Sequence, residues 1–152
     1  MRKLRVYIDT SVVGGCLEDI FAEASRKLLE MAEQGEIVLL VSDLLADELL
    51  EAPPAVAEVL QMLPGDCVEQ IIRSDEAYRL QECYLNAGVV GQSSKDDALH
   101  VALATVAAAD IIVSWNFKHI VHLDKIRKFN AVNALEGYSM IEIRSPQEIV
   151  TW

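Results

Sequence analysis

Short apolar runs alternate with longer amphipathic stretches along the chain. The apolar runs predict five strands, at residues 4–8, 37–41, 66–72, 111–114 and 139–143. The stretches between them predict helices over about 10–34, 44–51, 55–63, 76–87, 95–108 and 118–135, followed by a turn at 146–150. The first of these helices should break near Ala24–Ser25, and the last should consist of two pieces. The segment 37–41 contains no polar residue, which is typical of a strand covered on both faces in a parallel sheet.

This alternation of strands and helices predicts an α/β protein. We expect a three-layer α/β/α sandwich built on a mostly parallel sheet of about five strands. The length of 152 residues is that of one typical domain, and no repeat, low-complexity segment or flexible linker divides the chain. We therefore predict a single domain over residues 1–152.

Composition argues against several other classes of protein. The longest apolar stretch, residues 98–109, is too short to cross a bilayer and contains two polar residues. The amino terminus lacks the apolar segment and cleavage site of a signal peptide. The three cysteines, Cys16, Cys67 and Cys83, have neither the even number of a disulfide framework nor the spacing of zinc ligands. Together these features predict a cytoplasmic protein.

Charge is unevenly distributed along the chain. The formal net charge of −11 opposes non-specific binding to a polyanion. Residues 17–90 contain 16 acidic and four basic side chains, whereas residues 118–128 contain six lysine, arginine or histidine side chains and one acid. We call residues 118–128 the basic segment. It is either a solvated helix face or a local anion-binding patch on an acidic protein.

Polar side chains gather where the predicted strands end, which is the edge at which open parallel sheets bind ligands. Some follow a strand directly, and others lie in the first turns of the helices that begin at that edge. The candidates are Asp9, Ser42 or Asp43, Glu48, Asp97 and Asn116. Several oxygen donors converging on one point suit Mg²⁺ or Mn²⁺, which are hard cations that prefer carboxylates.

Each candidate also has a purely structural alternative. Asp9 could cap the following helix, and Glu48 could be a solvated helix residue. Asp97 after Ser94 is similar to a capping box, and Asn116 is a common turn former. The lone histidine on the helix over 95–108, His100, is expected in the core or at its rim.

Four segments resemble the motifs of the PIN-domain family, the metal-dependent ribonuclease fold found in VapC-like toxins of toxin–antitoxin pairs. The resemblance extends over about residues 4–145, in the family's order. The matching segments are Val6–Ser11, Ser42–Leu49, Asp97–Ala104 and Ala109–Asn116. The sequence departs from the family at the fourth acidic position, where Asn116 stands in place of the usual aspartate. One negative charge is lost there, so we expect any second metal site to be weaker.

The resemblance implies a divalent-metal-dependent endoribonuclease, a hydrolase that cleaves RNA phosphodiester bonds. Asp9 and Asp97 would be the main ligands of Mg²⁺ or Mn²⁺, and Glu48 would bind the metal or orient the attacking water. The remaining members of the predicted site are catalytic Asn116 and the supporting residues Thr10, Ser114 and Asp96.

The basic segment would then guide the RNA backbone toward the acidic pocket. The predicted RNA-binding residues are Lys118, Lys125, Arg127 and Lys128. Trp115, beside the pocket, either stacks on a base or packs within the protein. The resemblance also implies a homodimer, and an antitoxin partner that inserts a basic side chain into the pocket.

The main alternative function is a catalytically weak or silent PIN-like module that binds RNA or protein. The loss of the fourth acid at Asn116 and the acidic charge both favour it. Receiver domains and haloacid-dehalogenase-type phosphatases, which have a similar α/β build, are disfavoured because Asp9 is followed by Thr10 and Ser11 rather than by a second acid.

Overall fold

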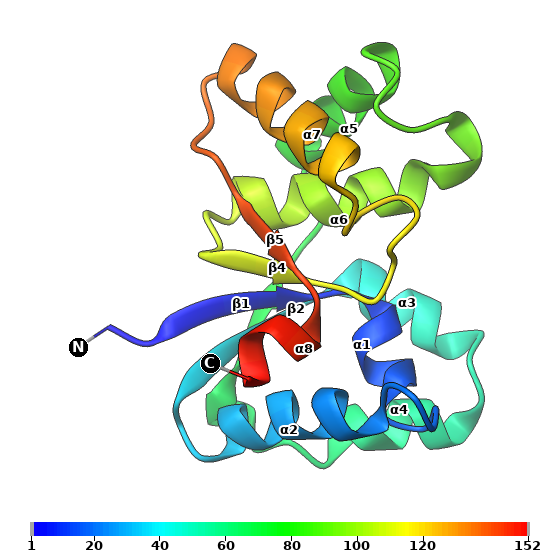
Figure 1. Ribbon diagram of the computed structural model, residues 1–152, viewed down its shortest axis with the longest axis vertical. Helices are drawn as coiled ribbons and strands as arrows, with labels where there is room; N and C mark the ends of the chain where they lie inside the picture. Colours follow the sequence, from blue (N-terminus) through cyan, green and yellow to red (C-terminus); the bar gives the residue numbers. More distant parts are fainter. Residues whose placement is uncertain (1, 152) are drawn as a thin grey trace.

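The computed structural model describes residues 2–151 and contains a five-stranded sheet whose strands are all parallel (Figure 1). The strands are β1 (Leu4–Ile8), β2 (Ile37–Ser42), β3 (Val68–Ile71), β4 (Ile111–Val113) and β5 (Glu142–Arg144). Their order across the sheet is β3-β2-β1-β4-β5, so the first strand of the chain lies in the centre. The predicted α/β class and five-stranded parallel sheet are confirmed.

Helices cover both faces of the sheet, which gives the predicted three layers (Figure 1). The helices on one face are α5 (Asp75–Asn86), α6 (Lys95–Val106) and α7 (Leu123–Leu135). Those on the other face are α1 (Thr10–Gly15), α2 (Ala22–Glu33), α4 (Pro54–Gln61) and α8 (Pro146–Val150). The remaining pieces are α3 (Asp43–Leu50), directly after β2, and the 3-10 helices η1 (Gly65–Cys67) and η2 (Gln92–Ser94). None of the helices in residues 2–151 has the length and apolarity to span a membrane.

The central strands contribute side chains to two separate cores. Val6 and Ile8 of β1 belong to the core under α1 and α2, whereas Tyr7 between them belongs to the core under α5 and α6. Leu39 and Leu40 of β2 divide between the two cores in the same way, and all five residues are fully buried. Because water is excluded from both faces, successive residues must all be apolar, which explains the uninterrupted runs in the sequence.

The direction in which the sheet grows reverses between β1 and β4. After β1 the chain adds β2 and β3 on one side, and then crosses over to add β4 and β5 on the other. Ile8 pairs with Val113 at the ends of the two strands, so Asp9 and Ser114 leave the sheet next to each other. Such a switch point opens a crevice beyond the carboxyl ends of the strands, which is where open parallel sheets bind ligands.

Two predicted helix boundaries are wrong. Ala24 and Ser25 lie inside α2, and the interruption falls instead at residues 16–21. Ser25 is compatible with the helix because its hydroxyl accepts a 2.7 Å hydrogen bond from Trp115 Nε1. The predicted helical piece beginning at 118 is absent from the described chain, where residues 117–120 form turns before α7. The last strand begins at Glu142, three residues later than predicted.

Two adjacent glycines of α1 should respond differently to alanine. A Cβ at Gly15 would lie 2.7 Å from Ser25 Oγ and 2.8 Å from Trp115 Nε1, whereas a Cβ at Gly14 meets no atom within 4 Å. Gly15→Ala should therefore lower the free energy of unfolding by about 1–3 kcal/mol, because the hydrogen-bonded pair must move apart. Gly14→Ala should leave it unchanged or raise it by up to about 1 kcal/mol, since alanine favours the helix. Urea denaturation measures both values, and equal effects would contradict the close packing at Gly15.

Candidate active site

The Asp9 carboxylate is buried at the carboxyl end of β1. Ser11 Oγ donates to Oδ1 at 2.6 Å, Ser114 Oγ donates to Oδ2 at 2.7 Å, and the residue is only 4% exposed. Asp9 occupies the N-cap position of α1, yet its side chain caps no backbone N–H, so the alternative of a simple helix cap is wrong. Burial raises the pKa of Asp9, and Glu48 raises it further, against the lowering effect of His100 and the two serine hydroxyls.

Glu48, in the second turn of α3, is held by two donors on one oxygen. Thr10 Oγ1 donates to Oε1 at 2.7 Å, and His100 Nε2 lies 2.6 Å from the same atom. Burial opposes ionisation, but the hydrogen bond and charge of His100, together with Thr10, keep the pKa of Glu48 below its ordinary value. Glu48 is thus an engaged carboxylate and not a solvated helix residue.

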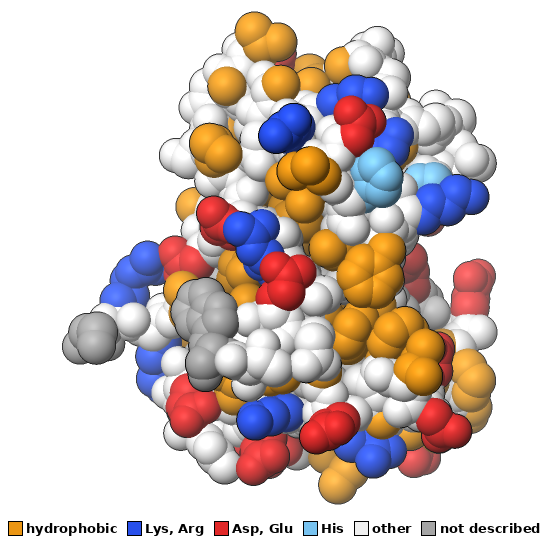
Figure 2. Space-filling view, viewed as in Figure 1, with side chains coloured by type: hydrophobic (Ala, Val, Ile, Leu, Met, Phe, Trp, Pro, Cys, Tyr) orange, Lys and Arg blue, Asp and Glu red, His pale blue; other side chains and the backbone are white. Residues whose placement is uncertain are grey.

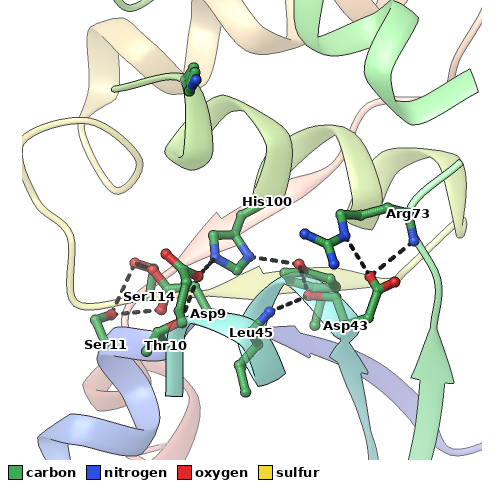
Figure 3. A network of polar contacts seen from close by, with 12 residues as sticks. Asp9, Thr10, Ser11, Asp43, Leu45, Arg73, His100 and Ser114 are labelled. Atoms are coloured by element: carbon green, nitrogen blue, oxygen red, sulfur yellow. Dashed lines mark hydrogen bonds and ion pairs between the residues drawn. The ribbon is translucent and has the colours of Figure 1, made fainter. Parts of the chain in front are cut away.

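His100 connects α6 to the strands and to α3. The residue is 2% exposed, and its Nδ1 lies 2.7 Å from the Tyr7 hydroxyl. Figure 3 shows its ring between the group formed by Asp9, Thr10, Ser11 and Ser114 and the group around Leu45 and Asp43. The sequence predicted a core or rim position and missed the contact with Glu48. The available signal was the spacing of three residues after Asp97, which places both side chains on one face of the helix.

Asp97 lies in the first turn of α6 and is partly exposed. No hydrogen bond joins its carboxylate to another group in residues 2–151. Burial raises the pKa of Asp97, as do Asp9 and Glu48, while His119 and His100 lower it. Glu48 thus affects the ionisation of both Asp9 and Asp97, and these three residues are here called the carboxylate cluster.

Asn116 is tied into its own turn. Its Oδ1 accepts from the backbone N–H groups of Lys118 at 3.2 Å and His119 at 2.9 Å, as in the turn-forming alternative. Its backbone N–H donates to Ser114 Oγ at 2.9 Å, and that hydroxyl in turn donates to Asp9. Asn116 reaches the carboxylate cluster through Ser114, and a direct catalytic role for its side chain stays a prediction.

Ser42, the last residue of β2, and Asp43, which follows it, do not join the cluster. Ser42 caps α3, because its hydroxyl accepts from the Leu45 N–H at 3.1 Å. Asp43 accepts from the backbone N–H of Arg73 at 3.0 Å and pairs with its guanidinium at 3.2 Å (Figure 3). These contacts join α3 to the segment after β3 and leave Glu48 as the acidic residue that α3 supplies.

The predicted supporting residues differ in their placement. Thr10 and Ser114 each donate a hydroxyl hydrogen bond to a carboxylate of the cluster. Asp96 is exposed, and its carboxylate has neither a hydrogen bond nor an ion pair with the rest of the described chain. A helix turns by about 100° per residue, so the neighbour of an inward-facing Asp97 points elsewhere.

The fold is similar to that of a solved structure. A chain in the crystal structure of VapBC2 from Rickettsia felis, bound to a DNA fragment from their promoter, matches with a TM-score of 0.58 over 93% of this chain and 98% of that chain. The sequence identity is 13%, so the similarity concerns the fold alone. This chain has a PIN-like fold. Its sequence matches no protein-family model and no curated protein.

Within the PIN-like fold, the donors of the cluster suit a hard divalent cation held by two carboxylates. Among residues 2–151, no group of three or more His, Cys, Asp or Glu side chains has the spacing of metal ligands. The charges of Asp9 and Glu48 raise the pKa of Asp97, and a cation beside Asp97 would offset that repulsion. Glu48 differs from Asp9 and Asp97 in its partner, because His100 Nε2 lies 2.6 Å from its Oε1.

The basic segment lies on the loop after β4 and on α7, where Figure 2 shows lysine, arginine and histidine side chains gathered on one face of the PIN-like fold. Lys125 Nζ donates to the Val89 carbonyl at 2.7 Å, and Lys128 Nζ pairs with Asp124 at 2.9 Å. Lys118 and Arg127 are exposed, and the described chain offers neither an ion pair. Of the four predicted RNA-binding residues, Lys125 and Lys128 thus have polar partners within the protein, and Lys118 and Arg127 are exposed without an ion pair in residues 2–151.

Trp115 packs within the protein. Its ring stacks on Phe21, with the ring centroids 4.3 Å apart, and its Nε1 donates to Ser25 Oγ at 2.7 Å. The packing alternative for Trp115 is confirmed. Phe117, which is 49% exposed and lies edge-on to Trp115, is the aromatic residue of this loop that meets solvent.

Replacing Asp9 with asparagine should stabilise the protein at neutral pH when no divalent cation is present. A raised pKa means that the folded state favours the protonated acid. Protonated Asp9 therefore contributes to the stability of the folded state. This contribution is complete below the unfolded-state pKa of about 4 and is lost as the pH rises through the folded-state pKa. At pH 7, Asp9→Asn removes the buried charge, and the free energy of unfolding should rise by about 1 kcal/mol.

Urea denaturation of wild type and Asp9→Asn at pH 7 and pH 4, both with EDTA, measures this difference. The advantage of the variant should shrink at the lower pH, where Asp9 in the wild type takes up a proton. A variant less stable than wild type at pH 7 would show that the serine hydrogen bonds outweigh the cost of burying the charge.

Proposed function

We propose that this protein is a divalent-metal-dependent endoribonuclease that hydrolyses RNA phosphodiester bonds. The observation that supports this is the convergence of Asp9, Glu48 and Asp97, from the end of β1, α3 and α6, at the switch point of a PIN-like fold. Glu48 raises the pKa of Asp9, and both raise the pKa of Asp97, so a cation nearby would help these carboxylates to remain ionised together. Magnesium or manganese is the matching cofactor, because all the donors are hard oxygens.

In this mechanism Asp9 and Asp97 would hold the cation, and the cation when bound would lower the pKa of a water and offset charge on the phosphate. Ser11 and Ser114 keep both Asp9 oxygens oriented. Glu48, ionised at neutral pH, receives the proton of the attacking water. In-line attack by the water oxygen would form the new P–O bond and break the bond from phosphorus to the 3′ oxygen, which takes a proton from solvent, and the products are a 3′-hydroxyl and a 5′-phosphate.

Cleavage of single-stranded RNA tests the proposal. Wild type should cut RNA with Mg²⁺ or Mn²⁺ and lose the activity with EDTA. Asp9→Asn and Asp97→Asn should each lower kcat/KM at least about 100-fold, because each removes an electrostatic group at the reacting phosphate. Asp66→Asn is the matched control, since it removes an exposed carboxylate just before β3, at the amino edge of the sheet.

Equal and negligible cleavage by wild type and Asp9→Asn would refute the nuclease. It would instead favour the silent PIN-like binding module, for which the internal hydrogen bonds of Asn116 are the specific supporting observation. RNA binding by that same protein, measured without cleavage, would then identify the module's ligand.

We propose further that the exposed cations of the basic segment contact RNA phosphates. Lys118→Ala with Arg127→Ala should weaken RNA binding and reduce the slope of log K against log salt by about 0.7 for each lost contact. Lys128→Ala should have a smaller effect, because Asp124 already partners its ammonium. Lys27→Ala, the same change on exposed α2, is the control. Fluorescence anisotropy at several salt concentrations measures the slopes for wild type and the three variants. Equal slopes for all four proteins would contradict this assignment.

A toxin role in the cytoplasm, a homodimer and an inhibitory antitoxin are further parts of the proposal. The similar chain belongs to a VapBC2 structure. The carboxylate cluster would bind a basic side chain from a partner as readily as a metal ion. Leu50 and Met62, which are 84% and 80% exposed, supply apolar surface of the kind that protein partners cover.

A further inference from the structure

His100 is a buried, hydrogen-bonded residue that takes no part in the reaction proposed above. Both of its ring nitrogens have partners, at 2.6 Å on Glu48 and at 2.7 Å on the Tyr7 hydroxyl. Its position joins α6, which carries Asp97, to α3, which carries Glu48. The inference below rests on the proposed nuclease, because it concerns how the same site divides its carboxylates.

The direction of the hydrogen bond to Glu48 follows from the acceptor. An ionised carboxylate can only accept, so His100 Nε2 must carry the hydrogen that points at Oε1. The Thr10 hydroxyl donates to the same oxygen. Two donors therefore occupy Oε1, whereas no hydrogen bond within residues 2–151 involves Oε2.

The opposite side of the ring is anchored in the sheet. The Tyr7 hydroxyl lies 2.7 Å from Nδ1 and 2.9 Å from Ser42 Oγ, which also caps α3. Tyr7 is fully buried, and its ring meets that of His100 edge-on. The imidazole is thus fixed by β1 and β2, so the Nε2–H that it presents to Glu48 has a fixed direction.

The same contacts make Glu48 a poor direct ligand. A cation on Oε1 would have to displace two hydrogen bonds and approach the N–H of a fixed ring. Asp9 and Asp97 carry no such basic partner, since Asp9 is bound by serine hydroxyls and Asp97 is partly exposed. Two partners within the protein therefore already occupy Oε1 of Glu48, whereas no histidine, lysine or arginine in residues 2–151 is hydrogen-bonded to the carboxylate of Asp9 or Asp97.

We propose that His100 is a positioning residue that holds Glu48 off the metal, so that Asp9 and Asp97 bind the cation directly and Glu48 acts through Oε2 on the attacking water. The assignment separates affinity for the cation from the rate of the reaction. Removing Glu48 should affect the rate, and removing Asp9 should affect both.

Titration of the full-length protein with Mn²⁺ alone, followed by calorimetry, is the first test. Glu48→Gln should keep the Mn²⁺ affinity within about threefold of wild type, whereas Asp9→Asn should lower it more than about tenfold. RNA cleavage by Glu48→Gln at saturating Mn²⁺ should show a large loss of kcat with little change in KM. An equal loss of Mn²⁺ affinity in the two variants would overturn the inference and leave the nuclease standing.

A double-mutant cycle tests the link between His100 and Glu48. His100→Phe should lower kcat without weakening Mn²⁺ binding, and combining it with Glu48→Gln should cost no more than Glu48→Gln alone. His100→Gln, which restores an N–H donor, should recover part of the rate. Additive losses, or no recovery in the glutamine variant, would show that His100 serves folding only.

Two further measurements keep the test informative if His100→Phe does not fold. Tyr7→Phe keeps the ring and removes one anchor of His100, so it should lower kcat while Mn²⁺ affinity is unchanged. In the nitrogen–proton NMR spectrum, wild type should show a slowly exchanging Nε2–H of His100 that shifts in Glu48→Gln. Absence of that signal would overturn the inference, and a wild type that neither binds Mn²⁺ nor cleaves RNA would overturn the proposed function together with it.

Discussion

Burial of the Asp9 carboxylate between the ends of β1 and β4 is the constraint on which the site depends. A charge taken out of water is costly unless donors or an opposite charge surround it. The hydroxyls of Ser11 and Ser114 supply two hydrogen bonds but no positive charge. The charge of Glu48 adds repulsion, which raises the pKa of Asp9 further. The charge of His100 offsets part of this cost, and the proposed metal ion, or a basic side chain of the proposed antitoxin, would offset more of it.

The protein treats its three carboxylates in two different ways. The pKa values of Asp9 and Asp97 are raised, chiefly by burial, while that of Glu48 is lowered by His100 and Thr10. When their environments separate the pKa values of neighbouring acidic groups in this way, the groups take different roles in catalysis. Here the separation is consistent with the proposed division, in which Asp9 and Asp97 bind the metal and Glu48 takes up a proton.

The sheet was predictable because a strand buried on both faces must be apolar at every position, and such runs are visible at 37–41 and 111–113. Helix ends were less predictable. The sequence indicated a break near Ala24–Ser25, but the Ser25 hydroxyl is used by Trp115, which is 90 residues away. A local pattern contains no information about such a distant partner.

The sequence by itself determined the class of fold and the placement of Asp9, Glu48 and Asp97 at one edge, because parallel strands all end on the same side of a sheet. Tertiary structure decided how each polar group is used. The partner of His100 lies 52 positions earlier in the chain, and the turn after β4 takes up the amide oxygen of Asn116. Hydrogen bonds depend on direction and on distances of about 3 Å. Only the packing of α3 and α6 against the sheet establishes those.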